Sequence, residues 1–177
     1  AMKAEKAYKD GLYYNPRNSF LMQSWAVMHE KAGRISQAMK LLKASVQSNP
    51  KHSASWVALG QIHQRQGRLD EARFCFKSAV DGDARSYVAL QAWGVLESNC
   101  GNLDEARKLF KDALRKSRNS GHALQAWATL ERRQGNLQAA GRLLSRALKE
   151  WPKSTRARVS LAEIHELRGD VEQARKT

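Results

Sequence analysis

Apolar residues recur along the chain at the three- and four-residue spacing that places them on one face of an α-helix. Leu90, Trp93 and Leu96 follow this spacing, and residues 103–114 follow it again. Gly101 lies between the two segments. Because glycine readily adopts the left-handed backbone that ends a helix, the pattern predicts two antiparallel helices joined by a tight turn.

The same pattern returns every 34 residues along the whole chain. The repeated glycines are Gly33, Gly67, Gly101, Gly135 and Gly169. Five residues after them stand Ala38, Ala72, Ala106, Ala140 and Ala174. Eight residues before them stand Trp25, Leu59, Trp93, Trp127 and Leu161. Self-similarity at this period predicts an all-α fold, a right-handed α-solenoid superhelix of antiparallel helix hairpins in which the small alanines let the two helices approach closely.

The period also divides the chain into repeats. We expect residues 1–18 to be the second helix of a truncated repeat and residues 155–177 to be an incomplete repeat. The full repeats between them are 19–52, 53–86, 87–120 and 121–154. Because a solenoid needs polar capping helices and neither end carries one, we expect a longer parent array and ends that could self-associate. Acidic residues begin several second helices, where they complement the helix dipole: Asp70, Glu71, Asp104, Glu105, Asp170 and Glu172.

One repeat resembles the tetratricopeptide repeat (TPR) family closely. It carries Trp56, Leu59-Gly60, His63, Gly67, Ala72, Phe76 and Ala79. Other repeats have their tryptophan at a later position, and two of them have a glutamate one turn further on: Trp25, Trp93 with Glu97, and Trp127 with Glu131. This arrangement resembles the half-a-TPR (HAT) variant. Residues 90–110 look most like its chloroplast branch, which implies stabilisation of organellar messenger RNA; a nuclear location is the alternative.

Charge gives a second indication of the partner. The chain has 31 Lys and Arg against 17 Asp and Glu, a net charge of +14, and every predicted repeat is positive. A polyanion is therefore a plausible partner. We expect single-stranded RNA along the concave surface lined by the first helices, where amides would contact bases and cations would hold phosphates. The predicted RNA-binding residues are Lys31, Arg34, Gln64, Arg65, Arg68, Gln91, Asn99, His122, Gln125, Arg132 and Arg133.

Two other interpretations of these residues stay open. In the first interpretation, these residues are ordinary solvated side chains at helix ends. In the second, the array is a scaffold that binds other RNA-processing proteins. Apolar positions on the first helices would then grip a peptide or a helix: Val57, Val88, Val95 and Val159. A continuous positive groove would favour RNA, whereas an apolar groove rimmed by charge would favour a protein.

Catalysis, metal binding and membrane insertion are not expected. His29, His63 and His165 share one repeat position with Glu97 and Glu131. Neighbouring helix axes lie about 8–10 Å apart, too far for such residues to meet one metal ion at ~2 Å, so we predict inter-helix contacts and no cofactor. The tryptophans and Cys75 occupy expected core positions, whereas Tyr13, Tyr14, Tyr87 and Trp151 lie near turns. No catalytic motif appears, and no run reaches the ~18 apolar residues of a membrane span.

Overall fold

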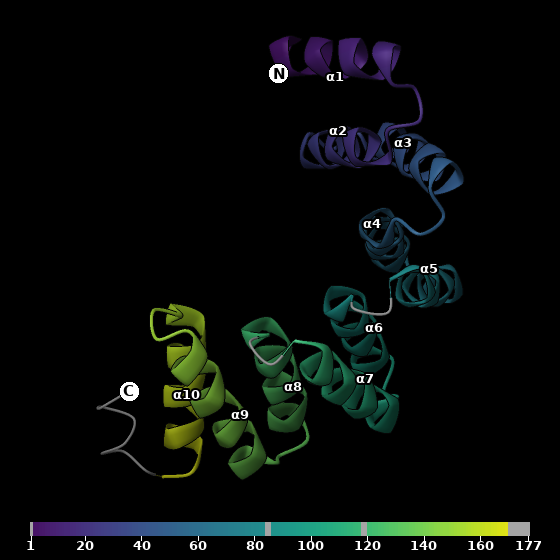
Figure 1. Cartoon of the computed structure of the whole chain (residues 1–177). Helices are drawn as coiled ribbons and strands as arrows, with labels where there is room; N and C mark the ends of the chain where they lie inside the picture. The colour runs from purple at the N-terminus through teal and green to yellow at the C-terminus, as the bar shows by residue number, and fades with distance from the viewer. Residues whose placement is uncertain (1, 84–85, 118–119, 170–177) are drawn as a thin grey trace. The chain divides into compact units, whose positions relative to one another are not determined.

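The computed structural model describes residues 2–83, 86–117 and 120–169, and within them the chain forms ten α-helices and no strand (Figure 1). The helices are α1 (Met2–Tyr14), α2 (Ser19–Lys31), α3 (Ile35–Ser48), α4 (Ser53–Arg65), α5 (Leu69–Gly82), α6 (Tyr87–Asn99), α7 (Leu103–Lys116), α8 (Gly121–Arg133), α9 (Leu137–Glu150) and α10 (Thr155–Leu167). The predicted all-α fold is confirmed: it is an α-solenoid of helical hairpins. Asp170, Glu172 and Ala174 lie outside the described residues.

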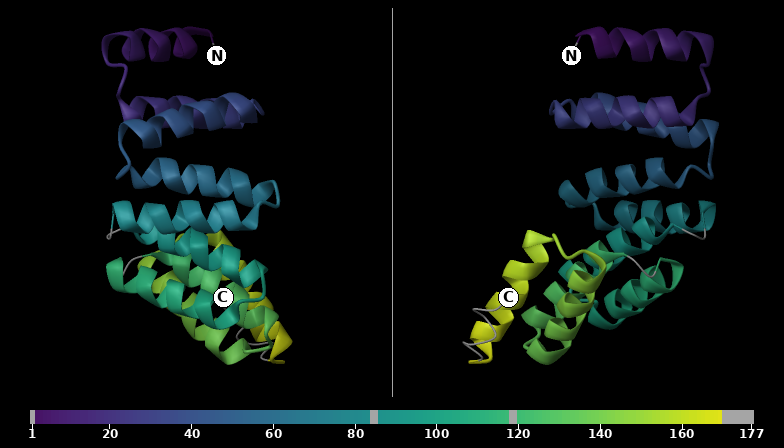
Figure 2. Two further views of the ribbon diagram at one scale, coloured as in Figure 1. Left: turned by 90° about the vertical axis from the view of Figure 1, so that its right-hand side faces the viewer. Right: turned by 60° about the vertical axis from the view of Figure 1, so that its left-hand side comes forward.

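The chain divides into two compact units, Ala1–Ala92 and Trp93–Thr177. In the first unit α2 packs against α3 and α4 against α5, while α3 also contacts α4 and joins the two hairpins. Figure 2 shows these helices of the first unit as successive layers. In the second unit α8 packs against α9, α7 against α8, and α9 against α10. In the pairs α2–α3, α4–α5 and α8–α9 the first helix therefore packs against the second helix that follows it.

The turn inside each hairpin has the predicted left-handed glycine. Gly33, Gly67, Gly101, Gly135 and Gly169 all have a positive φ, between 74° and 83°. At the first of them the backbone N–H of Arg34 donates to the carbonyl of His29 at 2.9 Å, and that of Gly33 donates to Glu30 at 2.9 Å. These two bonds form the Schellman arrangement that satisfies the last carbonyls of a helix. The 34-residue period of the sequence is therefore the spacing between successive glycine turns that end the first helices.

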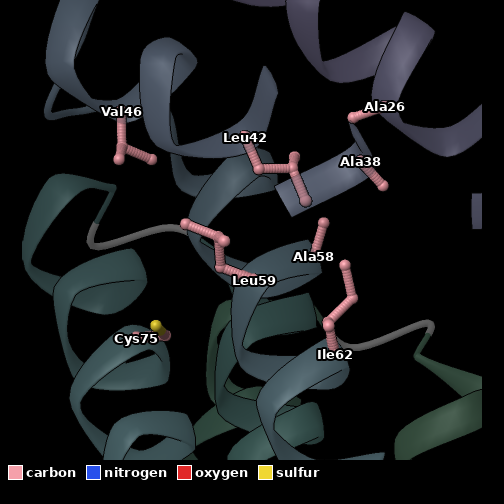
Figure 3. Close-up of a cluster of buried hydrophobic side chains, with 8 residues drawn as sticks. All are labelled: Ala26, Ala38, Leu42, Val46, Ala58, Leu59, Ile62 and Cys75. Atoms are coloured by element: carbon pink, nitrogen blue, oxygen red, sulfur yellow. The ribbon is translucent and has the colours of Figure 1, made fainter. Parts of the chain in front are cut away.

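The alanines of the repeat allow the two helices of a hairpin to meet. Ala38, Ala72, Ala106 and Ala140 each have no exposed surface. Figure 3 shows the resulting core of the first unit, in which side chains of α2, α3, α4 and α5 pack together: Ala26, Ala38, Leu42, Val46, Ala58, Leu59, Ile62 and Cys75. Burial also raises the pKa of the Cys75 thiol to about 11, as expected for a small core residue.

Small and large side chains complement each other inside each hairpin. Gly60 of α4 faces Phe76 of α5, and a Cβ atom added at Gly60 would lie 2.6 Å from the phenylalanine ring. Gly94 and Phe110 repeat this relation in the second unit, where the corresponding distance is 2.8 Å. Where the first helix has alanine, at Ala26 and Ala128, the second helix has leucine, at Leu42 and Leu144. A glycine in the helix therefore accompanies an aromatic ring on its partner.

A hydrogen-bond network around Glu131 links α7, α8 and the turn after α8. Arg107 donates to both carboxylate oxygens, at 2.8 and 3.1 Å, while Trp127 donates from Nε1 at 2.9 Å and Asn136 from Nδ2 at 2.7 Å. The carboxylate is buried, with a relative exposure of 5%. Chiefly through the bonds from Arg107, the pKa of Glu131 falls to about 2 although burial opposes the shift. The glutamate thus satisfies groups from two successive repeats.

The tryptophans are less buried than the sequence pattern predicts. Trp25, Trp56, Trp93 and Trp127 are all partly exposed. In the second unit the indole N–H of Trp93 donates to Glu97 at 2.9 Å, as that of Trp127 does to Glu131. At these two positions the indole N–H is directed to a carboxylate, so the ring lies at the edge of the helix pair and not in its centre.

The fit between glycine and phenylalanine can be tested by a double-mutant cycle. Alanine usually favours a helix over glycine by about 1 kcal/mol, but Gly60→Ala should lower the free energy of unfolding by about 1–3 kcal/mol because Phe76 has no room to move. Adding Phe76→Leu recreates the Ala26–Leu42 pair, so the double variant should be more stable than additive effects allow. Urea unfolding followed by circular dichroism measures all three changes.

Gly141→Ala is the matched control for this cycle. A Cβ atom at Gly141 of α9 would meet its nearest neighbour, Ile164, at 3.7 Å, which is an ordinary contact. This substitution should be neutral or stabilising by up to about 1 kcal/mol. Equal destabilisation by the two alanine substitutions, or strict additivity of the cycle, would show that the aromatic ring does not explain the glycine.

Glu131 should give the fold a specific acid sensitivity. The pKa of Glu131 is about 2 in the folded chain and 4.5 for a free glutamate. Its contribution to the free energy of unfolding is therefore complete above pH 4.5 and is lost as the pH falls towards 2. Glu131→Gln should lower the free energy of unfolding by up to about 3 kcal/mol at neutral pH, and its difference from the parent should shrink between pH 4.5 and 2.

Glu105→Gln provides the comparison, because Glu105 forms an exposed ion pair with Lys108 at 3.5 Å. Such pairs contribute at most about 1 kcal/mol. Chemical unfolding at several pH values measures both variants. If Glu131→Gln costs no more than Glu105→Gln at neutral pH, the network does not stabilise the hairpins.

Candidate functional site

The first helices of the first unit line a groove of about 550 Å³. Its apolar floor comes from Val27 of α2, Val57 and Ala58 of α4, and Val88 of α6. Polar side chains surround this floor: Gln23, Glu30, Lys31, Ser53, Gln61, Asp83 and Ser86. Val57 is buried, whereas Val88 is 45% exposed. We refer to these residues as the first-helix groove.

Charges of both signs meet at the first-helix groove. Lys31 is exposed at the end of α2, beside Glu30. Arg65 forms an ion pair with Glu30 across the two repeats. Asp83 adds a second acidic side chain to the lining. The groove is therefore apolar with a rim of mixed charge, and it is not a continuous positive channel.

The other predicted residues of the first unit have varied surroundings. Arg34 lies 3.8 Å from the carboxylate of Glu5. Arg68 donates a hydrogen bond to the side chain of Gln66 and lies 3.8 Å from the sulfur of Met39. Gln64 and Gln91 are half-buried. The predicted cations here are thus largely engaged with side chains of their own chain, and Lys31 is the exposed cation that lines the groove.

The predicted residues of the second unit form two local groups. Arg133 donates to the side-chain oxygen of Asn99 at 3.2 Å, and Arg132 beside it is exposed. Gln125 donates to the hydroxyl of Ser154 at 2.9 Å, which joins α8 to the residue before α10. Asn99 therefore connects two neighbouring repeats, and Gln125 connects α8 to the N-cap of α10.

His122 lies beside an aromatic side chain that the sequence pattern left unassigned to the core. Its ring makes an edge contact with Trp151, with ring centres 4.8 Å apart. Both line a pocket of about 580 Å³, together with Gln125, Glu150, Pro152, Lys153, Ser154 and Arg156. Gly121 allows this contact, because a Cβ atom there would lie 2.6 Å from the indole. Trp151 is 37% exposed.

Sequence reasoning missed several lining residues of the first-helix groove. Val27 and Gln61 occupy one repeat position, four residues after the position of Gln23 and Val57. That four-residue spacing places them on the same helix face as Gln23 and Val57, so the sequence pattern could have predicted them. Asp83 follows the end of α5, and its approach to α2 and α4 depends on how the repeats stack.

The shared histidine position serves packing between helices. His29 is buried, and its ring lies 5.4 Å from that of Trp25. Burial is the main cause that lowers the pKa of His29 and of His63. In the parts of the chain that the structure describes, no three His, Cys, Asp or Glu side chains gather closely enough to hold a metal ion. No helix in these parts is long and apolar enough to cross a membrane.

Comparison with protein families supports the repeat pattern. The sequence matches one tetratricopeptide repeat family over residues 30–94 and 131–177, and a second family of the same description over residues 93–119. No characterised protein matches the sequence at a significant level.

Solved structures show the same fold. The APC/C hetero-tetramer Cut9–Hcn1 aligns with a TM-score of 0.81 and 14% identity, over 97% of this chain and 35% of that chain. Yeast Tom70 aligns with a TM-score of 0.81 and 20% identity, over 94% and 36% respectively. YrrB, described as a TPR protein with an unusual peptide-binding site, aligns with a TM-score of 0.66 and 12% identity, over 95% and 87%. The chain thus spans about a third of the first two proteins.

Proposed function

Because this chain belongs to the tetratricopeptide repeat family, we propose that it is a non-catalytic protein-binding module whose first-helix groove holds an extended segment of a partner protein. The observation that carries this proposal is the composition of the groove, an apolar floor surrounded by amides, hydroxyls and charges of both signs. Its volume of about 550 Å³ falls within the range of roughly 300–1,000 Å³ that is usual for ligand sites.

The chemistry of the groove suits a peptide. Gln23 and Gln61 carry both donor and acceptor groups, which match the N–H and C=O groups of an extended main chain. Val27 and Val88 supply apolar surface for alternate side chains of the ligand. Lys31 can select the charge of flanking residues. The similar structures include a protein described as having a peptide-binding site and a hetero-tetramer, which agrees with this proposal.

RNA binding is the second candidate, and the net charge of +14 favours it. Within the second unit Arg132 is exposed and Arg133 lies beside Asn99, so an RNA strand would find cations and an amide together there. The HAT subtype, a place in RNA processing and a chloroplast location accompany this candidate as predictions from the sequence pattern. We place it second because Glu30 pairs with Arg65 and Asp83 adds negative charge in the first-helix groove.

Peptides selected from a displayed random library against the whole chain provide the test. Val88→Asp places a charge on the apolar floor, so it should weaken binding of a selected peptide about tenfold or more. Isothermal titration calorimetry measures the dissociation constants. Val159→Asp is the matched control, because Val159 is a similarly exposed valine (52%) on α10 and lies outside the groove. Selected peptides that bind both variants equally well would place the site elsewhere.

The RNA candidate is tested by fluorescence anisotropy with a labelled single-stranded oligonucleotide at several salt concentrations. Arg132→Glu with Arg133→Glu should reduce affinity about tenfold or more at low salt, because two phosphate contacts become repulsive. Lys40→Glu with Lys77→Glu makes the same change in net charge at exposed positions of second helices. Equal losses for the two pairs would mean diffuse attraction, and absence of binding at low salt would eliminate this candidate.

A further inference from the structure

A second groove lies in the second unit and is lined mainly by second helices. It has a volume of about 940 Å³, and most of its lining comes from the second helix α7, with Arg146 of α9 beside it. Its apolar floor contains Leu114 of α7 and the half-buried Trp127 of α8. Cationic side chains surround the floor: Arg107, Lys108, Lys111, Arg115 and Arg146. We refer to this feature as the second-helix groove.

Cationic side chains outnumber acidic ones in the lining of the second-helix groove. Among the described residues of that lining, Asp112 is the one acidic side chain, against five cations. Arg107 is committed to Glu131 inside the hairpin network. Arg115 pairs with Asp112 at 3.0 Å and Lys108 with Glu105 at 3.5 Å, but both cations keep about two thirds of their side chains exposed. Arg146 pairs with Glu150 at 3.5 Å. Exposed pairs of this kind are weak, so Lys108 and Arg115 can still meet an incoming anion.

The corresponding groove of the first unit has the opposite character. It runs between α3 and α5, has a volume of about 510 Å³, and contains Lys43 two repeats before Lys111. Asp70 and Glu71 belong to its lining, as do Trp56 and the exposed Phe74. The fold thus provides a groove at this place in both units, whereas the positive charge is specific to the second. Apart from Arg107, which holds Glu131, the cations of the groove are exposed side chains.

We propose that the second-helix groove binds an acidic segment of a partner protein, one in which Asp and Glu residues flank an apolar side chain. The apolar side chain would cover Leu114 and Trp127, while the carboxylates would meet Lys108, Lys111 and Arg115 at the rim. A nucleic acid is a poorer match, because its bases bind through exposed aromatic faces. The indole of Trp127 is half-buried and already donates to Glu131. This site is independent of the first-helix groove and of its ligand.

The probe for this site is a fluorescein-labelled peptide in which pairs of glutamates flank single leucines, titrated by anisotropy against the whole chain. Lys111→Glu with Arg115→Glu should reduce its affinity about tenfold, because two favourable charge contacts become repulsive. Lys43→Glu with Lys77→Glu is the matched control. These lysines occupy the repeat position of Lys111 and are exposed, and their substitution changes the net charge equally. The control should lose about twofold or less, since long-range attraction alone changes.

Three further arms complete the experiment. A peptide with the leucines replaced by serine should bind more weakly, since it cannot cover Leu114 and Trp127. Lys111→Gln with Arg115→Gln removes the charges without repulsion and should give an intermediate loss, and circular dichroism confirms that all variants are helical. A single-stranded oligonucleotide should compete poorly. The proposal is overturned if the parent chain fails to bind the peptide, if both charge-reversed pairs lose affinity equally, or if the oligonucleotide binds the same site more tightly.

Discussion

The close approach of two helices within each hairpin is the constraint on which the structure depends. Ala38, Ala72, Ala106 and Ala140 have no exposed surface, and the second helix can lie against the first because these side chains are small. At one pair of equivalent positions, the two central full repeats have glycine against phenylalanine and the two outer ones have alanine and leucine. The 34-residue period follows from this contact, since a helix pair of fixed length needs its turn glycine at a fixed place. The grooves on either side are spaces left between hairpins of this one size.

Charge is then divided between the interior and the surface. Glu131 is buried and receives hydrogen bonds from three side chains, so its negative charge is used to hold two repeats together. Lys111, Arg115 and Arg132 are exposed, and the ion pair of Arg115 with Asp112 lies on the surface of α7. An array built in this way has an excess of positive charge on its surface. The excess can be gathered locally, as in the second-helix groove, or offset locally, as Glu30 offsets Arg65.

Much of the hairpin could be predicted because its determinants are local. The positive φ at Gly101 needs only a glycine at a helix end, and the burial of Ala106 follows from its place on the apolar face. The surface could not be predicted as well, because its contacts join residues about one repeat apart. Arg65 and Glu30 meet between α4 and α2, and Arg133 reaches Asn99 from the next repeat. The partial exposure of Trp127 likewise depends on the glutamate that accepts its N–H.

The same separation between buried core residues and variable surface residues explains how one fold can bind different partners. Lys43 and Lys111 occupy the same repeat position, yet one lies beside Asp70, Glu71 and Phe74 and the other beside Arg107, Lys108 and Arg115. These neighbours differ at exposed or half-exposed positions, where substitutions change stability little. The buried alanines at the equivalent core position, Ala38 and Ala106, are the same in the two repeats. Because the groove persists when its charge changes, the ligand of each groove is decided by side chains that the fold leaves free to vary.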